Sequence, residues 1–121
     1  HVMVIADSCY SGTLLRAAPA QLKTAQRRIS WIKRMLGKRA RTALTSGGLE
    51  PVLDSGGGDH SVFTGAVIAA LHENSEVLEG QRLFDNIKRL VVLNSDQTPQ
   101  YSDVRLAGHD GGDFIFVPHR R

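Results

Sequence analysis

The sequence predicts a small α/β domain, and three features of its first half carry that prediction. Residues 1–6 form a short apolar run rich in β-branched side chains, which is typical of a buried strand. Residues 22–36 then carry apolar side chains at alternating spacings of three and four, the pattern of an amphipathic helix. A strand-like segment at residues 41–45 follows at once, so we expect the first two strands to be parallel.

The first strand ends at the polar pair Asp7–Ser8, and we expect it to be central in its sheet and buried on both faces. A central strand needs a neighbouring strand on each side. The predicted strand begins at the first residue, so nothing before it in this sequence can form a neighbouring strand. We therefore expect the chain to be part of a longer domain.

The remaining elements follow in the order helix, strand, helix, helix, strand. The first helix ends at Gly37, Asp59 or Ser61 can cap the second, and residues 101–106 follow the helix breaker Pro99. A glycine-rich turn at 108–112 then leads to a last strand at 114–117. The positions expected to face the core are Leu22, Ala25, Ile29, Ile32 and Leu36, then Val62, Phe63, Ala66, Val67, Ala70 and Leu71, and finally Leu83, Phe84, Ile87, Leu90 and Val91.

Composition bounds the class of protein. The 121 residues, 41% of them hydrophobic and 22% charged, suit one globular domain or half of a larger one. No apolar run approaches the roughly 20 residues of a membrane helix, so we expect a soluble cytoplasmic protein with no membrane partner. A single cysteine excludes an internal disulfide framework and a site built of zinc thiolates.

Charge is unevenly distributed along the chain. Residues 8–49 contain nine Lys or Arg and no Asp or Glu. This basic stretch fits a solvated helix face, a connector that proteases cut, or a surface that binds phosphates. The third of these interpretations, in which the stretch binds nucleic acid, is the least favoured.

The one cysteine, Cys9, directly follows the first strand. Ligands of parallel sheets gather at the carboxyl ends of the strands, and a helix amino terminus at Ser11–Gly12 would favour a thiolate there. Cys9 is therefore a candidate nucleophile, and the alternative is a buried, inert thiol.

The segment Val4-Ile5-Ala6-Asp7-Ser8-Cys9-Tyr10-Ser11-Gly12 resembles the nucleophile motif of the metacaspases and bacterial caspase-like peptidases, Asp-x-Cys-[His/Tyr]-Ser-Gly after a hydrophobic strand. Weaker matches follow in the family's order at residues 43–48, 60–64, 98–100 and 111–114. The resemblance implies that residues 1–121 are the carboxyl-terminal half of a caspase-like three-layer α/β/α sandwich with a mostly parallel sheet. Residues 16–42 would be a basic helix or connector.

The resemblance also implies the chemistry. The family is a group of cysteine endopeptidases that cleave after Arg or Lys by a Cys-His dyad, so Cys9 would be the nucleophile. Its histidine would lie in the upstream half of the domain, as the same or a cleaved chain, and we expect the isolated chain to be inactive. His60 is a weak alternative base. The rival interpretation is a catalytically silent pseudo-protease or regulatory interaction module that binds partners through the basic helix at 20–39.

Four further residues are candidates for substrate binding. Asp7 matches the acid that selects Arg or Lys in metacaspases, and the alternative is that it only caps the next helix. Thr45, Ser46 and Gly47 match the strand end that holds the substrate backbone, and the alternative is a simple turn.

Calcium and self-processing are the last expectations. No metal site is assigned, because the spacing of Asp54, Asp59, Asp110 and Asp113 matches no EF-hand loop, and calcium remains a candidate activator through the resemblance alone. An Arg-directed enzyme would be expected to cut itself after Arg16 and at Lys38–Arg39.

Overall fold

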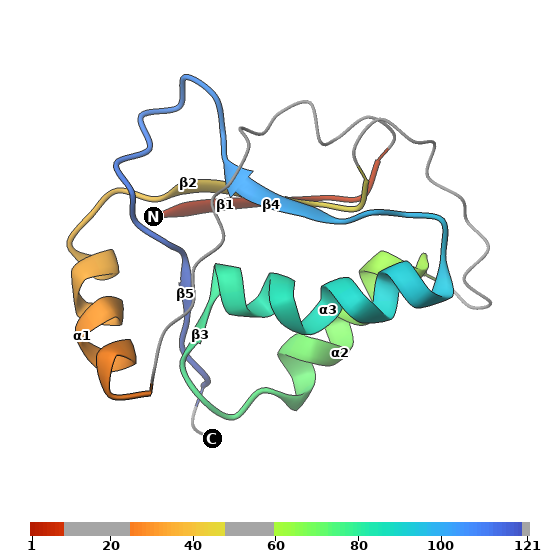
Figure 1. Cartoon of the computed structure of the whole chain (residues 1–121), viewed down its shortest axis with the longest axis horizontal. Helices are drawn as coiled ribbons and strands as arrows, with labels where there is room; N and C mark the ends of the chain where they lie inside the picture. Colours follow the sequence, from red (N-terminus) through yellow and green to blue (C-terminus); the bar gives the residue numbers. More distant parts are fainter. Residues whose placement is uncertain (9–24, 48–59, 120–121) are drawn as a thin grey trace.

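The structure is a computed structural model that describes residues 1–8, 25–47 and 60–119, and it is an α/β fold as predicted (Figure 1). The described elements follow in the order β1 (Val2–Ala6), α1 (Ala25–Leu36), β2 (Arg41–Thr45), α2 (Val62–Glu73), β3 (Leu78–Glu79), α3 (Gly80–Asn94), β4 (Gln100–Asp103) and β5 (Ile115–Phe116).

The first two strands are parallel, as the sequence predicts, and pair from Val2 opposite Arg41 to Ala6 opposite Thr45. β4 pairs with the other side of β2 and runs antiparallel to it, with Gln100 opposite Thr45. The described sheet has the order β1-β2-β4 and is mixed, so the expectation of a mostly parallel sheet is wrong for these strands.

The direction of β4 follows from the path of the two helices before it. The chain leaves β2 at the carboxyl edge of the sheet, crosses to the opposite edge along α2 and returns along α3 (Figure 1). Because two helices bring the chain back to the edge that it left, β4 has to start there and run against β2.

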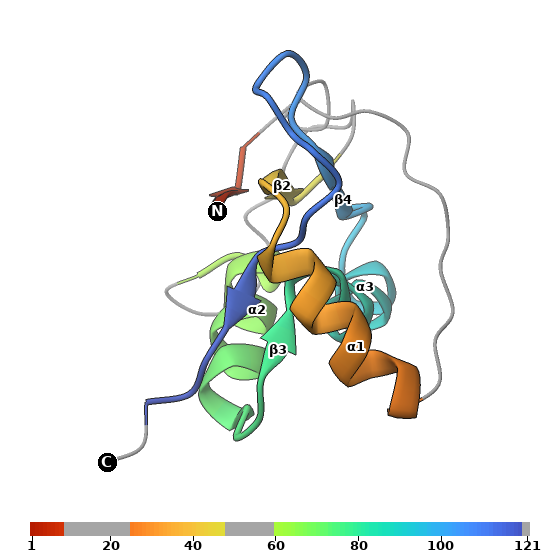
Figure 2. The same cartoon turned by 90° about the vertical axis from the view of Figure 1, so that its left-hand side faces the viewer.

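Helices α2 and α3 cover one face of this sheet, and no helix of the described residues lies on the other face (Figure 2). Apolar side chains of the sheet and of the two helices meet in one cluster between the layers. Its buried members are Leu44, Phe63, Ala66, Val67, Leu78, Leu83, Ile87, Val91 and Tyr101. Among the core positions predicted for α2 and α3, the prediction is wrong for Leu90, which is 51% exposed.

β1 is not buried on both faces as the sequence predicts. Val2 is 49% exposed, and Val4 and Ile5 are each 44% exposed. The reason is topological, because among the described residues β1 pairs with β2 alone and forms one edge of the sheet.

The packing of α1 also departs from the prediction. Ile29 is 65% and Leu36 53% exposed, whereas Trp31 and Met35 are half-buried. An ion pair fixes this rotation of the helix: Arg28 Nε donates to Glu79 Oε1 and Arg28 Nη2 to Glu79 Oε2, both at 3.0 Å. Arg28 Nη2 also lies 2.7 Å from the carbonyl oxygen of Val77. These contacts turn the Arg28 side of α1 towards β3, so Ile29 and Leu36 face outward. Ile32 is half-buried, and the side chains of Leu22 and Ala25 lie outside the described residues.

A buried carboxylate joins three other segments. Asp113 accepts hydrogen bonds from the Tyr101 hydroxyl, from the backbone N–H of Gln81 at 3.0 Å and from that of Phe114 at 2.8 Å. The Gly80 N–H donates to the Phe114 carbonyl at 2.8 Å, next to the short antiparallel pair of β3 and β5. Burial raises the pKa of Asp113 despite these donors. The start of α3 is thus fastened to both β4 and β5.

No helix within the described ranges has both the length and the apolar character to cross a bilayer.

Gly80 has no room for a side chain beside this carboxylate. A Cβ at Gly80 would overlap the Tyr101 hydroxyl and lie 2.8 Å from Asp113 Oδ1, whereas a Cβ at Gly65 in α2 would meet nothing within 4 Å. We expect Gly80→Ala to lower the free energy of unfolding by about 1–3 kcal/mol. Gly65→Ala, the matched control, should raise it by up to about 1 kcal/mol. Urea denaturation measures both, and equal effects would contradict the packing described.

The Arg28–Glu79 pair should make stability depend on pH. Burial raises the pKa of Glu79, but the hydrogen bond from Arg28, a backbone hydrogen bond and the charges of Arg28 and Arg82 outweigh it and lower the pKa. The ionised pair therefore stabilises the fold above the ordinary glutamate pKa of about 4.3, and this contribution is lost as pH falls through the folded-state value.

Glu79→Gln should accordingly cost about 1–3 kcal/mol at neutral pH. The gap in Tm between the two proteins should narrow as the pH is lowered below about 4. A gap that stays constant with pH would show that the pair contributes through packing alone.

Candidate active site

The parallel register of β1 and β2 brings two predicted site segments together. Ala6 lies opposite Thr45, and the Ser46 N–H donates to the Ala6 carbonyl at 3.0 Å. Asp7 and Ser46 therefore leave adjacent strands side by side at the carboxyl edge of the sheet. This is the edge at which the sequence places Cys9.

Asp7 is exposed and is held by the first turn of α2. Its Oδ2 atom accepts hydrogen bonds from the Ser61 hydroxyl and, at 2.5 Å, from the Thr64 hydroxyl. No described residue donates to Oδ1. Within the described part of the chain, the carboxylate is thus anchored through one oxygen only.

Ser61 also caps α2, as one of the two residues predicted to do so. Its Oγ accepts the backbone N–H of Thr64 at 3.1 Å. Ser61 is therefore both the helix cap and a donor to Asp7. Asp7 itself meets side-chain hydroxyls of α2, and the short helix expected directly after Cys9 lies outside the described residues.

Thr45, Ser46 and Gly47 are all buried at this edge. Thr45 Oγ1 donates weakly to the Gly47 carbonyl at 3.5 Å, which agrees with the turn interpretation of this segment. No hydrogen-bond partner is found for the hydroxyl of Ser46 among the described residues. A buried polar group without a hydrogen-bond partner lowers stability by about 1–3 kcal/mol. The Ser46 hydroxyl can therefore still form a hydrogen bond with a further group.

The structure adds one residue that the sequence analysis did not single out. Gln97, between α3 and β4, is 2% exposed, and neither side-chain amide atom has a described partner. It precedes the strand whose first residue, Gln100, lies opposite Thr45. Its only sequence signal is its position just before the breaker Pro99, which does not reveal that the side chain is buried.

The histidines are distributed over the whole fold. His60 is exposed and directly precedes Ser61, so it lies at the edge that holds Asp7. His1 is bonded to the Met35 carbonyl and His109 accepts the Arg41 N–H, both at the opposite edge of the sheet. His72 is in the last turn of α2. Of these four histidines, His60 alone lies at the edge that holds Asp7.

Cys9 itself, together with Tyr10–Gly12 and Arg16, lies outside the described residues. The structure therefore describes the strand that leads to the candidate nucleophile and the carboxylate two residues before it. Asp54 and Asp59 are outside the described residues as well.

The described acids do not fit a calcium site. Asp110 is exposed, whereas Asp113 is buried and bonded to Tyr101. Within the described ranges, no group of three or more His, Cys, Asp or Glu side chains is arranged to hold a metal ion.

Comparison of the chain with models of protein families, with curated proteins and with solved structures found no match.

Two substitutions separate the roles of the hydroxyls around Asp7. Ser61→Ala removes the helix cap and one bond to Asp7, and should destabilise the fold by about 1–2 kcal/mol. Thr64→Val removes only the bond from the Thr64 hydroxyl to the exposed carboxylate, and should cost less than about 1 kcal/mol. Thermal denaturation measures both. Equal losses would contradict the assignment of Ser61 as the cap.

Proposed function

We propose that the chain is the carboxyl-terminal half of a caspase-like cysteine endopeptidase that cleaves after Arg or Lys. The observation that carries the proposal is Asp7: an exposed carboxylate, oriented through one oxygen, at the carboxyl edge of a parallel strand pair and two residues before the single cysteine. In the metacaspase-type motif that this segment resembles, the same acid selects the cationic side chain of the substrate.

The proposed reaction uses Cys9 as the nucleophile. Its thiolate attacks the carbonyl carbon of the scissile peptide bond, and a protonated histidine gives its proton to the departing amine. The resulting acyl-enzyme is hydrolysed when the same histidine removes a proton from water. The products are a new carboxylate and the free thiol.

Asp7 supplies the preference for basic residues. An arginine of the substrate can donate two N–H groups to a carboxylate, and a lysine can donate one at a time. Because Ser61 and Thr64 both use Oδ2, the Oδ1 atom can accept the substrate cation without disturbing the anchor. With Oδ1 alone facing the substrate, Asp7 can pair with the cation of either Arg or Lys.

The base of the proposed dyad is a histidine of an upstream half-domain, which is also the proposed partner of the exposed edge of β1. The exposure of Val2, Val4 and Ile5 supports this arrangement, because additional strands and a covering helix would bury them. Completion in this way would also give the three-layer sandwich. His60 is the alternative base, favoured by its position beside Ser61.

A catalytically silent regulatory module is the second candidate function. The side chains of Ile29, Lys33 and Arg34 support it, because they make one side of α1 an exposed surface that is both apolar and basic. Such a module would keep the fold but would not acylate Cys9.

Covalent trapping tests the proposed enzyme. The complete protein, with its upstream half, is incubated with a peptide chloromethyl ketone that ends in Arg, and the labelled residue is located by mass spectrometry. We expect one label, on Cys9, and none in Cys9→Ala. Asp7→Ala should slow labelling by the equivalent of about 2–5 kcal/mol, the usual effect of leaving one partner alone in a charge pair that binding of the substrate buries.

Asp96→Ala is the matched control, because it removes the same charge from an exposed residue in the loop that enters β4 at this edge. It should leave the rate of labelling unchanged. Undiminished labelling of Cys9→Ala would refute the nucleophile, and faster labelling by a ketone ending in Asp would refute the specificity. Loss of labelling in His60→Ala would identify His60 as the base.

A further inference from the structure

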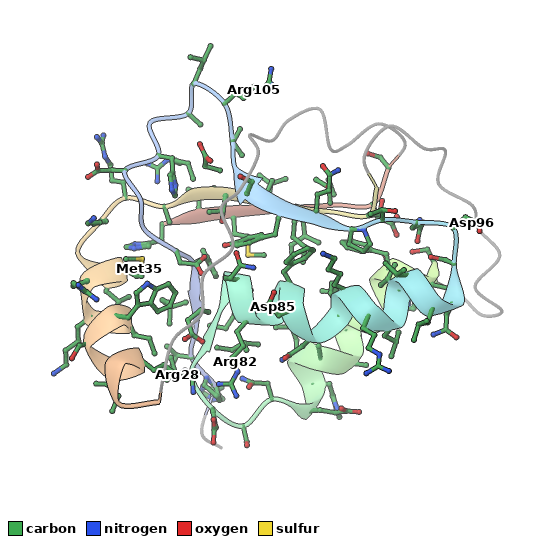
Figure 3. All side chains as sticks on the ribbon, in the orientation of Figure 1. Arg28, Met35, Arg82, Asp85, Asp96 and Arg105 are labelled. Carbon is green, nitrogen blue, oxygen red and sulfur yellow. The ribbon has the colours of Figure 1, made fainter. Side chains whose placement is uncertain are left out.

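The outward side of α1 combines apolar and basic side chains. Ile29, Lys33 and Leu36 are spaced by four and three residues, so they lie on one face of the helix. Ile29 is 65% and Leu36 53% exposed, and Lys33 between them is exposed as well. Figure 3 shows Arg28 and Met35 on the other side of α1, towards the rest of the molecule. α1 therefore turns an apolar stripe that contains a cation towards the solvent.

Basic side chains continue this surface past the end of α1. Arg34 in the last turn, and Lys38 and Arg39 in the link to β2, are all exposed. The link has a fixed position, because the N–H groups of Asp110 and Gly112 donate to the Arg39 carbonyl at 3.0 and 3.2 Å. We call the whole the α1 surface, and its members are Ile29, Lys33, Arg34, Leu36, Lys38 and Arg39.

The positive charge of the α1 surface is not balanced by neighbouring acids. Within the described ranges, no carboxylate forms an ion pair with its Lys and Arg side chains, whereas Arg28 on the opposite side of the helix is paired with Glu79. Asp110 borders the surface at Arg39, and the cations still outnumber it. Residues 8–49 as a whole contain no Asp or Glu. A partner that complements this surface is therefore anionic.

We propose that the α1 surface docks onto a membrane leaflet that contains anionic lipids. Its Lys and Arg side chains pair with lipid phosphates and carboxylates, and Ile29 and Leu36 enter the boundary between the headgroups and the acyl chains. The sequence predicts no membrane partner because no apolar run could span a bilayer, but a helix that lies on the leaflet needs no such run. This inference uses neither Cys9 nor Asp7, so it does not depend on the proposed function.

The apolar side chains favour a membrane over a nucleic acid. Phosphate backbones are bound through cations, and such binding gains nothing from exposed Ile29 and Leu36. A protein partner is disfavoured by the size of the surface. A helix of 12 residues is about 18 Å long, so its outer face is much smaller than the roughly 800 Å² that each partner contributes to a standard protein interface.

Docking through the α1 surface leaves the candidate site uncovered. In Figure 1, α1 lies at one end of the molecule, and the carboxyl ends of β1 and β2, where Asp7 lies, are at the other. Figure 2 shows α1 in front of the other helices. The membrane-bound protein therefore presents the edge with Asp7 away from the lipid.

Co-sedimentation with vesicles tests the proposal on the complete protein. The vesicles are phosphatidylcholine alone, or phosphatidylcholine with about 30% phosphatidylserine, at about 0.1 M salt. We expect binding to the anionic vesicles only. Lys33→Gln combined with Arg34→Gln should weaken it about 25-fold, since each cation near an anionic leaflet contributes about fivefold. Leu36→Gln should weaken it about tenfold, because the leucine side chain no longer leaves water.

Matched variants on α3 control for charge and for apolar exposure. Lys88→Gln combined with Arg89→Gln removes the same charge from exposed residues, and Leu93→Gln replaces a leucine that is 70% exposed. Both should bind the anionic vesicles like the unmodified protein. Circular dichroism should show equal helix content in all variants.

The other outcomes overturn the proposal. Absence of binding, or equal binding to vesicles without phosphatidylserine, refutes docking on anionic lipid. Equal losses in the α3 controls refute α1 as the docking surface. If Leu36→Gln changes nothing and the protein binds a DNA duplex more tightly than the vesicles, the surface binds polyanions through charge alone. None of these measurements requires peptidase activity, so failure of the proposed function would leave them unchanged.

Discussion

The hydrogen bonds to the buried carboxylate of Asp113 are the interaction on which the described fold depends. Burial works against the ionised form, so the carboxylate is tolerated only because the Tyr101 hydroxyl and two backbone N–H groups meet it together. These donors come from β4, from the start of α3 and from the segment before β5. The position of α3 follows from them, and the end of α3 determines where the chain enters β4. The geometry of the candidate site is therefore set in part at the far side of the molecule.

A second polar contact works in the same way on α1. The guanidinium of Arg28 donates to the carboxylate of Glu79, which has lost most of its contact with water, and also to the Val77 carbonyl. A helix with two plausible faces is thereby held in one rotation. Asp7 and Ser61 form the third such contact, and it ties the end of β1 to α2 across 54 residues of sequence. Three polar contacts between residues far apart in sequence thus fix the orientation of α1, α2 and α3, which apolar packing alone would not determine.

Much of this fold could be predicted from local pattern, and the failures share one cause. β2, the cap at Ser61 and the parallel pairing of β1 with β2 follow from runs and spacings that neighbouring residues determine. The exposure of Ile29 could not be predicted, because it depends on a pairing between Arg28 and Glu79 that are far apart in sequence. β3 has two residues and hence no periodicity to detect. At the candidate site, the meeting of Asp7 with Ser46 follows from the parallel pairing, whereas the hydroxyl anchors of Asp7 and the burial of Gln97 depend on tertiary packing.

The path of the chain between β2 and β4 places a constraint on how this fold can evolve. Each full-length helix carries the chain from one edge of the sheet to the other, so two helices return it to the edge where it started. Lengthening both helices by the same number of turns would keep the entry point of β4, and sequence changes on their outer faces would not move it. Gain or loss of one whole helix would deliver the chain to the opposite edge, and Gln97 and Pro99 would leave the neighbourhood of Asp7. Whether the number of helices between β2 and β4 is even or odd, rather than their sequence, decides which end of β4 lies beside the site.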